Sequence, residues 1–158
     1  MKKLTLLACS LFLFAASGFA QTNDAPATVQ NSFKAKYGNV QVKDWDWEDD
    51  EEMYEAEFKM NGKEYEAYFT ADGTWMKTKA ELKKEELPAG VSSALNSGQY
   101  KAWNMGDRME MDTPEGKMYK VKVENKDQTM YLKYDANGKL VETMTKEQKK
   151  MKMDAKKK

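Results

Sequence analysis

The sequence contains no histidine, and its only cysteine, Cys9, lies close to the N-terminus. The missing histidine removes the commonest general base and the commonest transition-metal ligand. The serines at 92, 93 and 97 therefore have no histidine to activate them, and no cysteine nucleophile follows residue 9. We therefore predict that the protein is not an enzyme and needs no cofactor.

Long apolar runs are also scarce, because only residues 4–14 form one. Two lysines precede this run and small residues, Gly18 and Ala20, follow it, which is the pattern of a secretory signal peptide cleaved after Ala20. The run is shorter than the roughly 20 residues that a membrane-spanning helix needs. We predict a signal peptide over residues 1–20 and export to the periplasm or the extracellular space. An alternative, in which residues 6–9 form a lipoprotein cleavage box and Cys9 carries a lipid anchor, is less favoured because few residues precede Cys9.

The chain has no excess of either charge, with 26 basic and 26 acidic residues. Such a balance predicts neither nucleic-acid binding nor general membrane binding. The distribution is uneven, because residues 44–57 hold nine acidic residues and no basic one, whereas residues 146–158 hold seven lysines. An exported domain without disulfides is typical of bacterial envelopes.

The region after the signal peptide repeats itself. A helix-start pattern of a proline followed by apolar residues recurs 62 residues later, and a hairpin pattern recurs 65 residues later. The helix-start residues are Pro26, Val29 and Phe33, then Pro88, Val91 and Leu95, and the hairpins span residues 65–73 and 130–138. We predict one domain over residues 21–144, with repeat one at about 26–79 and repeat two at about 86–143, followed by a lysine-rich tail over 145–158.

Each repeat predicts one short helix and about four antiparallel strands. Val29, Phe33 and Tyr37 lie on one helical stripe, residues 54–60 alternate between apolar and polar, and Asn61-Gly62 favours a type I′ hairpin turn. Thr78-x-x-Glu81 has the pattern of a capping box and predicts a short linking turn over residues 82–87. The tail has too few apolar residues to predict firm docking. The predicted fold class is α+β, with both helices on one face of a single sheet and the other face partly open.

Several of these features, in their order along the chain, resemble the bacterial PepSY-like family, which is also described as β-lactamase-inhibitor-like. The resemblance covers about residues 25–143 and includes the signal peptide, the first helix and four short motifs. The motifs are Trp45-x-Trp47, Phe69-x-x-Asp72-Gly-x-Trp75, Leu87-Pro88 and Tyr134-x-x-Asn137-Gly138. The resemblance implies two tandem α-β-β-β-β units in one curved antiparallel sheet. In the inhibitor that gives the fold its name, the concave face of the sheet clamps an enzyme.

We therefore predict a binding module that inhibits or regulates a secreted or envelope protein through its open sheet face. Tyrosine and tryptophan are favoured at such interfaces because they bury a large area with few rotatable bonds. The candidate partner-binding residues are Trp45, Trp47, Tyr68, Trp103 and Tyr131. For the two neighbouring tryptophans, packing beneath the helices is the competing interpretation. The expected partner is a protein, and we expect a monomer or a weak dimer.

Two other functions stay open at this point. A small-molecule or calcium sensor would use the acidic segment or a pocket between the two halves. In the acidic segment the calcium ligands would be Asp46, Glu48, Asp49 and Asp50, although the segment lacks the glycine of a calcium-binding loop. The methionine pairs at 109 and 111 and at 151 and 153 have the spacing of Cu(I) ligands, but no histidine is present to complete such a site. A structural component of the envelope is the third possibility.

Overall fold

The computed structural model describes residues 25–156 and consists of a single eight-stranded antiparallel sheet in which the strands follow one another in chain order. The predicted signal peptide and Cys9 lie outside the described residues. The helices are α1 (Ala27–Tyr37), α2 (Ala89–Ser97) and α3 (Lys146–Lys156), with one 3₁₀ turn, η1 (Lys84–Glu86). The strands are β1 (Val42–Glu48), β2 (Met53–Met60), β3 (Lys63–Phe69), β4 (Trp75–Glu81), β5 (Asn104–Thr113), β6 (Gly116–Glu124), β7 (Thr129–Asp135) and β8 (Leu140–Thr145).

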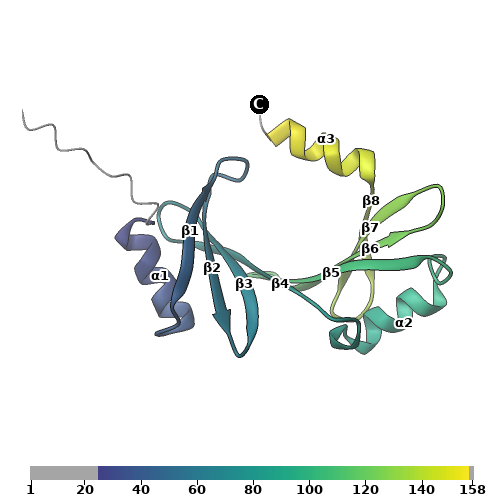
Figure 1. The fold of residues 1–158 in the computed structure, drawn as a ribbon, viewed down its shortest axis with the longest axis horizontal. Coiled ribbons are helices and arrows are strands. Elements are labelled where there is room, and N and C mark those ends of the chain that lie inside the picture. Colours follow the sequence, from purple (N-terminus) through teal and green to yellow (C-terminus); the bar gives the residue numbers. More distant parts are fainter. Residues whose placement is uncertain (1–24, 157–158) are drawn as a thin grey trace, which may run out of the picture.

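The sheet is curved, with α1 and α2 against its outer side and α3 on the other side, next to β8 (Figure 1). This arrangement confirms the predicted α+β class. One helix followed by four strands occurs twice in chain order, which is compatible with the predicted tandem repeat.

Both sheet-covering helices form as the sequence predicts. Val29 and Phe33 of α1 are buried against the first half of the sheet, and Val91 and Leu95 of α2 are buried against the second half. Helix α1 ends at Gly38, whose φ of 71° suits glycine and whose N–H donates to the carbonyl of Lys34 at 2.8 Å.

The sheet therefore has two cores, one beneath each helix. The first is largely aromatic: Phe33 packs edge-on against Phe58 and Trp45, with ring centroids 5.0 and 5.7 Å apart. The second is mainly aliphatic, with Val121 and Leu132 completely buried beneath α2. Each core fixes the face of the sheet that its helix covers.

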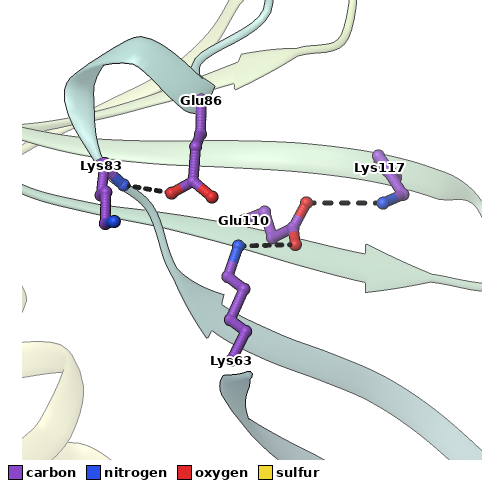
Figure 2. Close-up of polar contacts among 5 residues, drawn as sticks. All are labelled: Lys63, Lys83, Glu86, Glu110 and Lys117. Carbon is purple, nitrogen blue, oxygen red and sulfur yellow. Dashed lines mark hydrogen bonds and ion pairs between the residues drawn. The ribbon is translucent and has the colours of Figure 1, made fainter. Parts of the chain in front are cut away.

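The turn at Asn61-Gly62 is confirmed as type I′, because both residues have positive φ, 53° and 82°. The predicted capping box at Thr78 and Glu81 is wrong. Both residues lie in β4, because this segment pairs with β5, and strand pairing overrides the local capping pattern. The linking turn lies within the predicted residues 82–87, and there the backbone N–H of Lys83 donates to the Glu86 carboxylate at 2.6 Å (Figure 2).

An ion-pair bridge joins the two halves on the helix-covered face. The carboxylate of Glu110 on β5 lies 3.3 Å from the ammonium of Lys63 on β3 and 3.4 Å from that of Lys117 on β6 (Figure 2). It borders a cleft of about 380 Å³ that is also lined by Tyr37 and Thr78, whose hydroxyls hydrogen-bond to each other.

None of the helices within residues 25–156 is long and apolar enough to cross a membrane.

Candidate functional site

The open face of the sheet is the surface that α1 and α2 leave uncovered. Side chains alternate between the two faces of a strand, so the strand register assigns each residue to one face. Ala67 and Phe69 of β3 lie in the core beneath α1, which puts Glu66 and Tyr68 on the open face. On β6, Val121 and Val123 lie beneath α2, which puts Lys120 and Lys122 on the open face.

The first half of the open face is acidic. Asp44 lies opposite Glu57 and Asp46 lies opposite Glu55, so carboxylates face one another across β1 and β2. Burial raises the pKa of Glu55, and the negative charges of Glu66 and Glu48 raise it further. This part of the face therefore repels anions.

Tyr68 lies at the boundary between this acidic region and a basic one. Its side chain is only 3% exposed, because charged side chains cover the ring. Its hydroxyl donates to Glu66 at 2.9 Å and accepts from the ammonium of Lys79 at 2.6 Å. The ammonium groups of Lys77 and Lys79 lie 4.4 and 3.9 Å from the ring centroid, within cation–π range. Burial and the carboxylates of Glu55 and Glu66 raise the pKa of Tyr68, so the hydroxyl stays protonated and is a donor at neutral pH.

The middle of the open face has a lysine cluster, made of Lys77 and Lys79 on β4, Lys120 on β6 and Lys133 on β7. Lys120 on β6 lies directly opposite Lys133 on β7. Partial burial lowers the pKa of Lys120, and the positive charges of Lys133, Lys79 and Lys77 lower it further. The lysine cluster is therefore a region of concentrated positive charge on a partly desolvated surface.

Three methionines on β5 and β6 lie next to Lys120 on the open face. Met109 lies opposite Lys120, and Met111 lies opposite Met118 on the neighbouring strand. Met111 is almost fully buried, whereas Met118 is partly exposed. Methionine side chains are flexible and polarisable, so they can adapt to irregular partner surfaces. The open face thus combines flexible apolar side chains with fixed charges.

Helix α3 borders the open face at its far end. Reciprocal hydrogen bonds between Thr145 and Gln148 cap its N-terminus, as a capping box does. The ammonium of Lys149 lies 4.1 Å from the ring centroid of Tyr131, and Lys152 pairs with Glu142 at 3.2 Å. The tail is therefore a helix with polar contacts to β7 and β8, rather than an undocked segment.

The expectation that the tryptophans line the open face is wrong. Trp45 is only 9% exposed and packs against Phe33 beneath α1, so the competing interpretation describes it correctly. Trp47 lies on the same side of its strand and packs against Tyr54, with 40% of its surface exposed. Trp103 packs edge-on against Tyr100 beside the core under α2.

The two tyrosines do lie on the open face, but neither is a freely exposed anchor. Tyr68 is buried under Lys77 and Lys79, and Tyr131 lies beneath Lys149 of α3. The five candidate residues therefore do not form one patch.

The acidic segment offers no preformed calcium site. Within the part of the chain that the structure describes, no group of three or more acidic, histidine or cysteine side chains is arranged to hold a metal ion. The carboxylate of Asp46 accepts a hydrogen bond from the backbone N–H of Trp47 at 2.8 Å. The calcium alternative at Asp46, Glu48, Asp49 and Asp50 gains no support from this geometry.

Sequence reasoning missed the lysine cluster. A signal was present, because lysines alternate with valines along β6, and a second lysine lies in the facing part of β7. Alternating lysines are usually interpreted as a solvated strand face. Only the register between β6 and β7 brings Lys120 and Lys133 together.

Comparisons with known proteins find one family and one shared fold. The family model described as "Putative beta-lactamase-inhibitor-like, PepSY-like" matches residues 52–142. No curated protein matches the chain. Among solved structures, a DUF2874 family protein from Bacteroides ovatus is 27% identical, covers 77% of this chain and 88% of its own, and has a TM-score of 0.71.

Two more distant structures share the fold. A BLIP-like protein from Bacteroides fragilis is 24% identical, with coverage of 78% of this chain and 87% of its own and a TM-score of 0.71. A structure from Bacteroides eggerthii, described as "putative periplasmic proteins", is 21% identical, with coverage of 77% and 89% and a TM-score of 0.67.

Proposed function

The chain belongs to the PepSY-like, β-lactamase-inhibitor-like family, and from this premise we propose that it is an exported, non-enzymatic binding module that inhibits or regulates a secreted or envelope protein. The observation that carries the proposal is the open face. It combines three methionines, Met109, Met111 and Met118, with an acidic half and a lysine cluster. The family description names an inhibitor, and the sequence has no histidine for acid–base catalysis.

The geometry of the open face supports protein binding over small-molecule binding. Small-molecule sites are enclosed, largely apolar pockets with a few polar groups. The open face is instead a broad curved surface in which charges of both signs are spread over seven strands, β1, β2, β3, β4, β6, β7 and β8. Such a distribution favours a partner of complementary charge and shape, because electrostatic complementarity directs association and excludes wrong partners.

Site-specific photocrosslinking tests which face the partner uses. A photoreactive amino acid would replace Met118 on the open face or, as the matched control, Ser93, which is exposed on α2. Each protein would be irradiated in native envelope extract. We expect a discrete crosslinked product from position 118 and none from position 93. Products of equal yield from both positions, a product only from position 93, or no product from position 118 would contradict the proposal.

A further inference from the structure

Two lysines at the centre of the open face, Lys120 and Lys133, form no ion pair within the part of the chain that the structure describes. Among residues 25–156, no carboxylate lies within ion-pair distance of Lys120 or Lys133. The other two members of the lysine cluster are satisfied, because Lys77 pairs with Glu51 and Lys79 interacts with Tyr68 and Glu66. Glu142 lies directly opposite Lys133 on β8, but its carboxylate pairs with Lys152 of α3 at 3.2 Å. The positive charge of Lys120 and Lys133 is therefore available for an external anion.

This arrangement costs stability in the isolated protein. Like charges directly opposite each other on neighbouring antiparallel strands are destabilising. The lowered pKa of Lys120 has the same physical origin, because burial and neighbouring ammonium groups disfavour its charged form. A carboxylate bound between the two ammonium groups would remove the repulsion and would satisfy both donors.

The surroundings of the pair indicate what kind of anion fits. Met109 lies opposite Lys120, and Met111 and Met118 form the next pair along the same two strands. A ligand that reaches the two lysines must therefore also cover thioether side chains. A segment that carries both carboxylates and apolar side chains matches this surface better than a small hydrophilic anion does.

The acidic half of the open face limits how such a segment can lie. Asp44, Asp46, Glu55 and Glu57 occupy the open side of β1 and β2. A long polyanion that crossed the whole face, such as a nucleic acid, would meet these carboxylates. A short acidic segment centred on β6 and β7 would avoid them.

We propose that Lys120 and Lys133 bind the carboxylates of a short acidic segment of the partner protein, whose apolar side chains rest on Met109, Met111 and Met118. This proposal rests on the proposed function and adds the chemistry of the bound segment. The acidic half of the face then sets the direction of the segment through repulsion.

Methyl NMR of the ¹³C-methionine-labelled protein tests this proposal. The probe is a short capped peptide in which glutamate alternates with leucine, and the matched control peptide has glutamine at each glutamate. Met111 and Met118 report on the open face, whereas Met130, which packs against the core beneath α2, is an internal reference. We expect the glutamate peptide to shift the open-face signals in a saturable way while the reference stays unchanged.

Charge variants assign the effect to the two lysines. Lys120→Gln and Lys133→Gln should each weaken peptide binding by about tenfold, or ~1.4 kcal/mol, because hydrogen bonds to charged groups are stronger than neutral ones. Lys126→Gln, in the exposed loop between β6 and β7, is the matched control and should bind like the unmodified protein.

Three outcomes would overturn the proposal. Equal binding of the glutamine peptide would show that charge is not recognised. Equal shifts with inorganic phosphate would show that the lysines bind any small anion. No saturable shift, or shifts only at reference methionines, would show that the open face does not bind acidic segments. A crosslink from position 118 would still support the proposed function in each case, whereas its absence would contradict the function itself.

Discussion

Replacing Lys120 with methionine should stabilise the protein. Lys120 is half-buried, lies opposite Lys133 and is close to Lys79 and Lys77, without an ion pair among residues 25–156. Methionine has a similar unbranched stem and can keep the packing, but it carries no charge. The substitution therefore removes both the repulsion and the cost of burying an ammonium group.

The expected gain in the free energy of unfolding is about 1 kcal/mol. A cross-strand pair contributes roughly 0.2–1 kcal/mol, and this is the scale of the repulsion between Lys120 and Lys133. Burying a thioether instead of an ammonium adds a similar amount, since charged groups are costly to desolvate. For a domain of this size the melting temperature should rise by roughly 3–5 °C. The four tryptophans allow unfolding in urea to be followed by intrinsic fluorescence.

The gain should depend on pH in a defined direction. The pKa of Lys120 in the folded protein lies below its ordinary value of 10.5, through burial and Lys133, Lys79 and Lys77, with Glu142 opposing the shift. Between the lowered pKa and 10.5, the unfolded chain binds more protons than the folded one, so the stability of the unmodified protein rises with pH. The advantage of Lys120→Met is therefore complete at neutral pH and shrinks in the alkaline range.

The matched control for Lys120→Met is Lys126→Met. Lys126→Met, in an exposed loop, should change the free energy of unfolding by less than about 0.5 kcal/mol. If Lys120→Met lowered stability at neutral pH, or if its advantage were the same at every pH, the ammonium would be well satisfied in the free protein. The argument for an external carboxylate would then fail.

Two further substitutions test the packing that creates the open face. Phe58→Ala should lower the free energy of unfolding by about 3–5 kcal/mol in urea titrations, because Phe58 is completely buried against Phe33; a loss below about 1 kcal/mol would contradict the assigned core. Gly90→Ala should destabilise by about 1–3 kcal/mol despite the higher helix propensity of alanine, because the added Cβ would lie 2.4 Å from the carbonyl oxygen of Asn137. Gly106→Ala is its control, since the Cβ there meets only the flexible side chain of a lysine, and equal melting temperatures for the two variants would refute the assigned contact.

Much of the fold could be predicted because local patterns and tertiary packing agree. Val29 and Phe33 lie on one side of a helix, so they become buried when this helix packs against the sheet. Asn61 and Gly62 accept positive φ more readily than other residues, so their turn type follows from the sequence. Where a local pattern competes with strand pairing, as at Thr78 and Glu81, the pairing wins because it involves many more hydrogen bonds.

The binding face was harder to predict. The alternation of side chains along a strand assigns residues to two faces, but it does not show which face the helices cover. The alternation at Trp45 and Trp47 correctly places both tryptophans on one side of β1, but it does not say that α1 covers this side. That choice is made by Phe33, which comes from a different part of the chain and packs against Trp45. Tyr68 shows the complementary problem, because the correct face does not imply an exposed ring.

Chain order explains why the acidic and the basic regions of the open face are separate. In this sheet each strand pairs with its neighbours in sequence, so position along the chain becomes position across the face. The acidic run at residues 44–57 therefore becomes an acidic region on β1 and β2. The alternating lysines of β6, together with Lys133 of β7, become a basic region several strands away. A sheet with crossover connections would have mixed these regions. The simple meander preserves the separation, so the proposed acidic segment would be attracted by the lysines of β6 and β7 and repelled by the carboxylates of β1 and β2.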